Sequence, residues 1–187
     1  MNYKLDKFER LVDSLQNLPT IGKKSAIKLA YHLILNDSFN ALKLAHNIED
    51  AVGSLQRCCK CFNITEDEIC KICDDEYRDS VLAIVQSPKD IEIIEQSGQF
   101  KGRYYVVDSI ERLDTAHLKK IASEYDELIF AFTPSVANES MILYIEDKLS
   151  DLRINFSKIA HGVPTGVSLE SIDMISLSHA INSRTHL

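Results

Sequence analysis

The sequence predicts an α+β protein of three successive parts: a small helical unit, a four-cysteine metal-binding segment and an α/β domain with a mainly parallel sheet. Three observations support this architecture. Apolar residues follow helical spacing over residues 4–56, two cysteine pairs lie within residues 58–73, and short apolar runs alternate with helical stretches from residue 81 onward. We expect domains at 1–57, 58–79 and 80–165, with a C-terminal helix or tail over 166–187.

The first segment has the pattern of three short helices. Apolar residues recur every three or four positions, beginning with Leu5, Phe8 and Val12, as expected where one face of a helix is buried. Proline and glycine within residues 18–22 end the first helix, and the Asn-Asp-Ser run at 36–38 ends the second. We therefore expect a small unit made only of helices.

The last segment alternates between two patterns. Apolar runs typical of strands are separated by stretches with helical spacing, and the connections between them are short. This order favours a parallel sheet with helices packed over it. The predicted strands are 81–86, 103–108, 127–132 and 153–160, and the predicted helices are 88–96, 115–124, 136–149 and 169–182.

Composition excludes several classes of protein. Hydrophobic residues make up 45% and charged residues 26% of the chain, which excludes a disordered or collagen-like protein. No run reaches the roughly 18 apolar residues that a membrane-spanning helix requires. The first residues, MNYKLD, become charged at once and lack the apolar core of a secretion signal. We therefore expect a cytoplasmic protein.

The distribution of charge points to one basic patch. The 187 residues include 21 bases and 28 acids, a net charge of −7, which argues against coating nucleic acid by bulk charge. Residues 14–36, however, contain no acid and include Lys23, Lys24 and Lys28. A local basic patch on an acidic body is compatible with this pattern.

Four cysteines are spaced as ligands of a metal ion. Cys58, Cys61, Cys70 and Cys73 form two C-x2-C pairs separated by eight residues, which allows four thiolates to surround one structural Zn²⁺. The alternatives are two disulfides or four unrelated thiols, and disulfides are rare in the cytosol. Cys59 is expected to lie outside the site, although a change of register could exchange it with Cys58. We expect the local fold to depend on the metal.

Residues 18–26, LPTIGKKSA, have the form of a helix-hairpin-helix motif. In such a motif, a glycine such as Gly22 permits a positive φ, and the next helix would begin with free N–H groups that can bind a phosphate oxygen. The alternative is an ordinary turn between two helices with solvated lysines. The absence of acids around it favours contact with the DNA backbone.

The hairpin, the cysteine spacing and the C-terminal segment AHGVPTGVSLE (160–170) together resemble the RecR family of bacterial recombination mediators. The resemblance covers essentially the whole chain. It implies a Toprim fold for residues 80–165 and a homo-oligomer, in the form of a ring, that binds single-stranded, duplex or gapped DNA. It also implies that the protein acts with RecO, and in some settings RecF, to load RecA onto DNA covered by single-strand-binding protein, in association with the nucleoid.

The resemblance also suggests roles for individual residues. Lys24 and Lys28 match the family's basic pair after the hairpin, and Lys23 stands where a proline is more usual. We therefore expect all three lysines to contact DNA. The family's glycine-rich loop is shortened here to the DSIERLD run at 108–114.

The acids that Toprim enzymes use to hold Mg²⁺ are largely missing. Gln86 stands where a Glu is expected, Ala137 replaces another acid, and no Asp-x-Asp follows the strand at 127–132. Asp90 and Glu139 remain in suitable places, and the resemblance implies that acids on this face bind RecO. The alternative for both is an ordinary solvated position at a helix start.

We therefore expect a DNA-repair mediator without catalytic residues. The chain also lacks the Gly-x4-Gly-Lys-Ser/Thr motif of nucleotide hydrolases, and the Gly162–Gly166 loop alone is weak support for a phosphate site. Two other functions stay open. One is a metal-dependent DNA enzyme with a degenerate Toprim site, and the other is a zinc-containing adaptor that binds only proteins, which the negative charge favours.

Overall fold

The chain forms two compact units that divide between Leu55 and Gln56. The computed structural model describes residues 5–160 and residue 174. The predicted glycine and proline loop at 162–166 lies outside the described residues, and so does the predicted helix at 169–182 apart from residue 174. Among the described helices, none has both the length and the apolar character that crossing a membrane requires.

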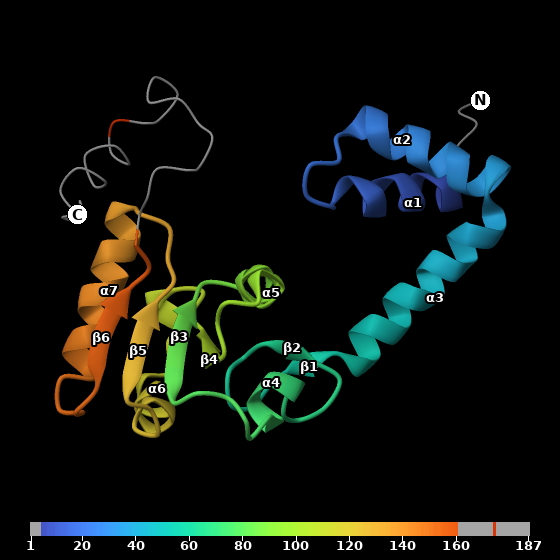
Figure 1. The fold of residues 1–187 in the computed structure, drawn as a ribbon. Helices are drawn as coiled ribbons and strands as arrows, with labels where there is room; N and C mark the ends of the chain where they lie inside the picture. Colours follow the sequence, from blue (N-terminus) through green and yellow to red (C-terminus); the bar gives the residue numbers. More distant parts are fainter. Residues whose placement is uncertain (1–4, 161–173, 175–187) are drawn as a thin grey trace. The chain divides into compact units, whose positions relative to one another are not determined.

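The first unit is helical, as its apolar spacing predicts (Figure 1). Its elements are α1 (Asp6–Gln16), α2 (Lys23–Tyr31), the π-helical turn η1 (His32–Asn36) and α3 (Ser38–Ser54). Helices α1 and α2 form a hairpin whose core contains Val12, Ala26 and Ala30. The two alanines are fully buried, and their small side chains allow the two helices to pack closely. Helix α3 buries none of its residues.

The second unit contains a four-stranded parallel sheet, which confirms the predicted α/β class. The strands are β3 (Val81–Val85), β4 (Arg103–Val106), β5 (Glu127–Phe130) and β6 (Asn155–Lys158). Their order is β4-β3-β5-β6, with all neighbouring pairs parallel. Each strand is shorter than the run that predicted it. Strands β3, β4 and β5 begin at the predicted residue and end one or two residues earlier, whereas β6 is shorter by two residues at both ends.

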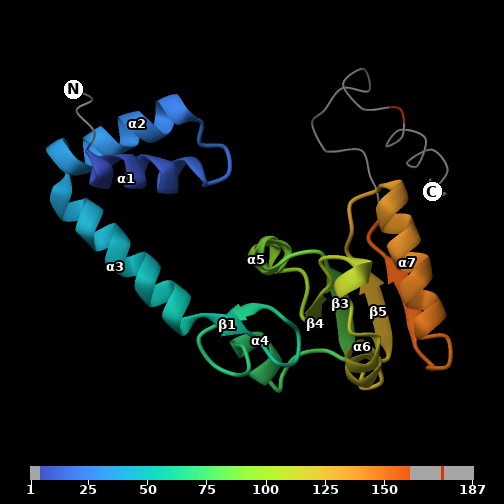
Figure 2. The ribbon, with the colours of Figure 1, turned by 180° about the vertical axis from the view of Figure 1, so that it is seen from behind.

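Helices cover both faces of this sheet (Figure 2). The helices of this unit are α4 (Lys71–Asp74), α5 (Pro88–Ser97), the 3-10 turn η2 (Ile110–Arg112), α6 (Thr115–Ala122) and α7 (Val136–Lys148). Successive side chains of a strand point to opposite faces, so β3 divides the core in two. Leu82 and Ile84 pack with α6 and α7, whereas Ala83 and Val85 pack with α5.

The cysteine knuckle, residues 56–74, lies at the edge of the sheet. Its strands β1 (Gln56–Arg57) and β2 (Ile64–Thr65) pair in antiparallel fashion, and α4 completes it. The Cys61 carbonyl oxygen accepts a hydrogen bond of 2.9 Å from the backbone N–H of Val106 in β4. The knuckle therefore covers an edge strand whose backbone groups would otherwise be exposed.

Candidate functional site

The start of helix α2 presents uncapped backbone donors beside two lysines, and a third lysine lies one turn further along the helix. Gly22 is the N-cap residue, and no side chain caps the first N–H groups of the helix. A Cβ added at Gly22 would meet no heavy atom within 4 Å, so the helix start is open to solvent. The first turn contains no acid. These features allow a helix N-terminus to hold a phosphate oxygen.

Gly22 does not take the positive φ that a glycine permits in this turn. Gly22 has φ −80° and ψ 165°, whereas Thr20 has φ 69°. The left-handed residue reverses the chain two positions earlier, and Gly22 then takes the extended conformation that is usual for an N-cap. The glycine therefore contributes the absence of a side chain rather than a left-handed backbone.

The three predicted DNA-contacting lysines are all exposed on α2, two of them in its first turn and Lys28 in its last. Lys24 and Lys28 are one helical turn apart and so lie on the same side of α2. Lys23 is the first residue of the helix. Within the described part of the chain, none of the three has an acidic partner. Their positive charges are therefore available to an anionic ligand.

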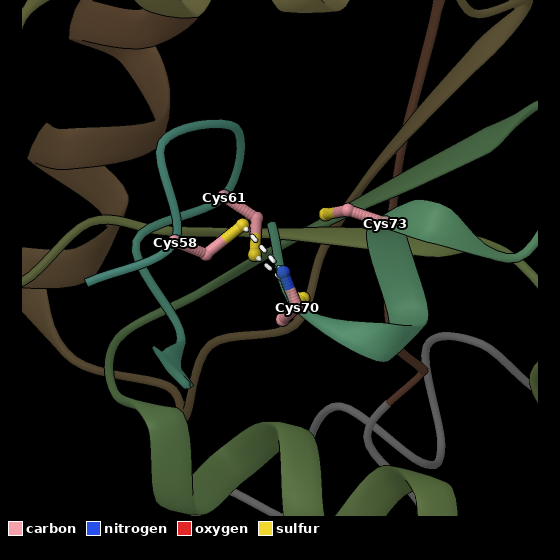
Figure 3. Close-up of side chains that lie close together, drawn as sticks. All are labelled: Cys58, Cys61, Cys70 and Cys73. Atoms are coloured by element: carbon pink, nitrogen blue, oxygen red, sulfur yellow. Dashed lines mark hydrogen bonds between the residues drawn. The ribbon is translucent and has the colours of Figure 1, made fainter. Parts of the chain in front are cut away.

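The four predicted metal ligands lie together in the cysteine knuckle (Figure 3). All four are buried, and their Sγ atoms lie within 4.8 Å of one another. The Cys61 and Cys70 sulfurs are 3.5 Å apart, which compares with about 3.8 Å between sulfurs in a tetrahedron with Zn–S distances of about 2.3 Å. Among the described residues, this is the only group of three or more His, Cys, Asp or Glu side chains arranged to hold a metal ion.

The knuckle backbone supports this arrangement. Within each C-x2-C pair a turn brings the two sulfurs together, and the backbone N–H of Cys73 donates to the Cys70 carbonyl at 2.9 Å. The N–H of Cys70 donates to the Cys58 sulfur at 3.3 Å and so holds this sulfur toward the second cysteine pair. Cys59 is exposed and outside the cluster, and all five cysteines are free of disulfides. The donor set therefore fits one tetrahedral ion with no open position.

The crowding of these thiols makes a cation necessary if all four are to ionise. The hydrogen bonds of Cys61 with Cys70 and then Cys73, together with burial, raise the pKa of the Cys61 thiol. The hydrogen bond from Cys61 is the main cause that lowers the pKa of Cys70. The protons are thus shared within the cluster, and a divalent cation would release them by offsetting the charge of the thiolates.

Aromatic side chains attach the knuckle to the sheet and to helix α6. Phe62 follows the second cysteine with a positive φ of 62° and packs on Tyr105 and His117, at centroid distances of 5.3 and 5.0 Å. His117 also bridges the two parts, because its ring nitrogens lie 2.9 Å from the Tyr105 hydroxyl and 3.0 Å from the Cys59 carbonyl. These contacts hold a strained residue in place and fix the knuckle against the sheet.

An uncharged amide pair occupies the end of β3, where Toprim enzymes hold Mg²⁺. The Gln86 amide donates to the Asn138 side-chain oxygen at 2.9 Å, and Asn138 donates back at 3.2 Å. Asn138 also donates to the Thr133 carbonyl at 2.7 Å and is buried. Mg²⁺ prefers carboxylate oxygens, so the residues present here do not fit that ion.

The two predicted partner-binding acids lie near the carboxyl ends of the strands, and each already contacts a neighbouring side chain. Asp90 closes the capping box of α5, because one of its oxygens accepts bonds from the backbone and hydroxyl of Ser87 at 2.8 and 3.0 Å. Glu139, in the first turn of α7, forms an ion pair of 3.1 Å with Lys158. Glu139 is about half exposed and so remains accessible.

Several residues that organise these sites were not singled out by the sequence. Asn138 stood between two positions considered for acids, and only the fold pairs it with a residue 52 positions away. A positive φ at Phe62 has no signal in the sequence. Arg57 and Arg112, which line a pocket beside the knuckle, lie on elements too short to show a periodicity.

Known proteins match the chain over its whole length. The family model described as "RecR, helix-hairpin-helix" matches residues 8–52. The chain is 50% identical, over all of both chains, to "Recombination protein RecR" of a Nitratiruptor species. It is 51% identical to the protein of that name from a strain of Helicobacter pylori, over 96% of this chain and 95% of the relative. It is 48% identical to that of Campylobacter jejuni subsp. doylei, over 98% of each.

Proposed function

Because the chain belongs to the RecR family of recombination proteins, we propose that it is a non-enzymatic mediator of recombinational DNA repair. In this proposal it forms a zinc-stabilised clamp on DNA. It acts with RecO, and in some settings RecF, to help load RecA onto strands covered by single-strand-binding protein. The observation that carries the proposal is the acid-free start of α2, where Lys23 and Lys24 stand beside uncapped backbone N–H groups and Lys28 follows one helical turn later. Such a site binds the DNA backbone without reading its sequence.

The proposed metal is one structural Zn²⁺ bound by the four clustered cysteines. Four buried sulfurs within 4.8 Å of one another would complete the coordination of one ion and leave no place for water, which favours a structural role over catalysis. The Zn²⁺ would hold the two turns of the knuckle together. The knuckle in turn carries Phe62 and the Cys61 carbonyl, through which it contacts the sheet.

The proposed homo-oligomer is supported by the apolar surface of helix α3. Five large side chains on this helix are between 49% and 78% exposed, and none of its residues is buried. Leu44, Ile48 and Val52 recur every four residues and so line one side of the helix, and an exposed apolar stripe of this kind is typical of a protein interface. We propose that a second copy of the chain covers it and that assembly brings several hairpins to one DNA. The five residues are Phe39, Leu42, Leu44, Ile48 and Val52.

We propose that the protein is not an enzyme, because an amide pair occupies the end of β3 where acids would be needed to hold a metal ion. Gln86 and Asn138 carry no charge and satisfy each other, so they offer little to a divalent ion. We propose that Asp90 and Glu139 near this edge take part in binding RecO. Glu139 is the more exposed of the two, and its pairing with Lys158 is of the weak surface kind.

The proposal is tested by loading of RecA onto a single strand covered by single-strand-binding protein. We expect the full chain with RecO to shorten the lag before RecA assembles, whereas Lys24→Ala/Lys28→Ala does not. No effect of the unaltered chain with RecO or RecF would contradict the mediator role. Metal-dependent nicking of plasmid DNA that disappears in Glu139→Ala would instead support the enzyme alternative.

A further inference from the structure

A pocket of about 350 Å³ opens where the cysteine knuckle meets the end of strand β4. One wall comes from the knuckle, and another comes from β4 and the turn at 108–114 that follows it. Ligands of parallel sheets commonly bind at the carboxyl ends of the strands. The volume is within the range of about 300–1,000 Å³ that is typical of sites for small organic groups. The lining residues that matter here are Arg57, Phe62, Tyr105, Asp108, Ser109 and Arg112.

This pocket combines aromatic and apolar side chains with charged and polar ones. Phe62 is partly exposed and lies edge-to-face against the fully buried Tyr105 ring, with Val106, Val107 and Leu113 nearby. The Tyr105 hydroxyl is already bonded to His117. The interior therefore favours a flat, weakly polar group over a phosphate.

Two arginines from different elements stand at the rim. Arg57 comes from β1 and Arg112 from η2, and their side chains are 59% and 77% exposed. Both approach one oxygen of Asp108, at 3.9 and 3.2 Å. A guanidinium has five N–H donors, so this shared oxygen leaves donors free on each arginine for phosphate groups outside the pocket.

The charged residues of the pocket indicate that a phosphate binds at its rim and not in its interior. Two arginines and two aspartates, Asp108 and Asp114, line it, so the interior has no excess positive charge that would draw in a phosphate. The Asp114 carboxylate is also engaged, because it caps α6 by accepting from the His117 backbone N–H at 2.9 Å. Asp108 and Ser109 can still bond to the polar edge of a ring.

We propose that this pocket receives one unpaired nucleobase of single-stranded or gapped DNA, with the neighbouring phosphates at Arg57 and Arg112. Proteins bind unpaired bases by combining aromatic contacts with basic groups along the backbone. A base within a duplex is stacked on both sides and cannot enter. The pocket would therefore favour unpaired DNA, whereas the hairpin at α2 binds any DNA backbone. The inference rests on the proposed DNA-binding function.

The test uses the full chain purified with its metal and a gapped duplex that carries 2-aminopurine in the gap. The emission of this base rises when it leaves the stack, so binding of the unaltered protein should raise it. Arg57→Ala/Arg112→Ala should abolish the rise and weaken binding to oligothymidylate about tenfold. Its affinity for an intact duplex should change less than about twofold. Lys101→Ala/Lys120→Ala, which removes the same charge from exposed positions, is the matched control.

A second variant tests whether a base enters the pocket without changing the charge of the protein. Ser109→Phe adds a ring to the pocket lining at an extended residue, with φ −161°, and leaves the charges unchanged. We expect it to abolish the rise in emission while duplex binding persists. If the emission does not change when the unaltered protein binds the gapped duplex, the base-binding role of the pocket is wrong and the proposed function still stands. An equal loss of duplex and single-strand affinity in the arginine variant would also overturn the base-binding role. Failure of the unaltered protein to bind any DNA would overturn the proposed function as well.

Discussion

Val106 donates its backbone N–H to the carbonyl oxygen of Cys61 at 2.9 Å, whereas the adjacent Val107 donates to Val85 within the sheet at 2.8 Å. Two neighbouring amides of the chain therefore depend on different partners. One depends on the cysteine knuckle, and the other depends on strand β3. This relationship makes the structural role of the metal measurable at single residues.

Removal of the metal should release the Val106 amide and leave the Val107 amide protected. Without a cation the four thiols cannot all ionise, and no ion joins the two turns of the knuckle. The knuckle therefore loses its turns, and the Cys61 carbonyl leaves the sheet edge. Hydrogen exchange measured by NMR before and after chelation tests this. We expect exchange at Val106 to accelerate at least about tenfold. Equal protection of both amides before and after metal removal would show that the knuckle does not depend on the metal.

The ion pair between Arg78 and Glu95 should make stability depend on pH. Arg78 donates two hydrogen bonds to the Glu95 carboxylate, at 2.8 and 2.6 Å, and these bonds are the main cause that lowers the pKa of Glu95 below its ordinary 4.5. A lowered pKa in the folded state gives stability that is present above the ordinary pKa and is lost as the pH falls through the lowered value. The contribution should therefore be complete at pH 7 and decline below about pH 4.5.

Glu95→Gln should reduce the free energy of unfolding by about 2 kcal/mol at pH 7, because it removes a charged hydrogen-bond acceptor from the partly buried Arg78. Urea unfolding at pH 7 and at acidic pH measures the effect. The difference in the free energy of unfolding between the variant and the unaltered protein should become smaller at acidic pH. The same substitution at the exposed Glu124 is the control. A difference that is constant with pH would contradict the assigned ion pair.

Gln86→Glu should destabilise the protein without creating an enzyme. A carboxylate cannot donate to the Asn138 oxygen that Gln86 now contacts at 2.9 Å, and Asn138 is buried. We expect a loss of about 2 kcal/mol in the free energy of unfolding. We also expect no nicking of plasmid DNA with Mg²⁺. Gln99→Glu, at an exposed position, is the control. Mg²⁺-dependent nicking by Gln86→Glu would mean that the site retains the rest of a catalytic centre.

Thr20→Asn should stabilise the hairpin of the first unit. Thr20 is exposed and has a φ of 69°, which is unfavourable for a β-branched residue and tolerated by asparagine. We expect the free energy of unfolding of this unit to rise by about 0.5–1 kcal/mol, as measured by hydrogen exchange of the α1 and α2 amides. Faster exchange in the variant would show that the threonine side chain contributes a contact that outweighs the strain.

The sequence predicted the features that depend on local pattern. Apolar runs located the four strands, and the Ser87-Pro88 start of α5 followed the expected boundary. The cysteine spacing selected the four sulfurs that lie together and left out Cys59. Helical spacing located α1, α2 and α3. Each of these signals is contained in a short stretch of chain, which is why the sequence alone reveals it.

Features that arise from distant or strained residues could not be predicted. Gly22 permits a positive φ, but the left-handed residue of the turn is Thr20, because the path of the turn and not its composition decides which residue is left-handed. The small strands β1 and β2 follow from the turns of the knuckle and have no periodicity. The contact between His117 and the Cys59 carbonyl joins residues 58 positions apart. Such contacts depend on the completed fold.

DNA binding at the start of α2 is tested most directly by fluorescence anisotropy on a gapped duplex across a salt series. We expect salt-sensitive binding by the unaltered protein. Lys24→Ala/Lys28→Ala should weaken it and reduce the slope of log affinity against log salt by at least about 1. Lys101→Ala/Lys120→Ala should leave the slope unchanged. Binding that appears only with RecO would favour the adaptor alternative. Binding by the Lys24/Lys28 variant with unchanged affinity and slope would contradict DNA contact at this helix start.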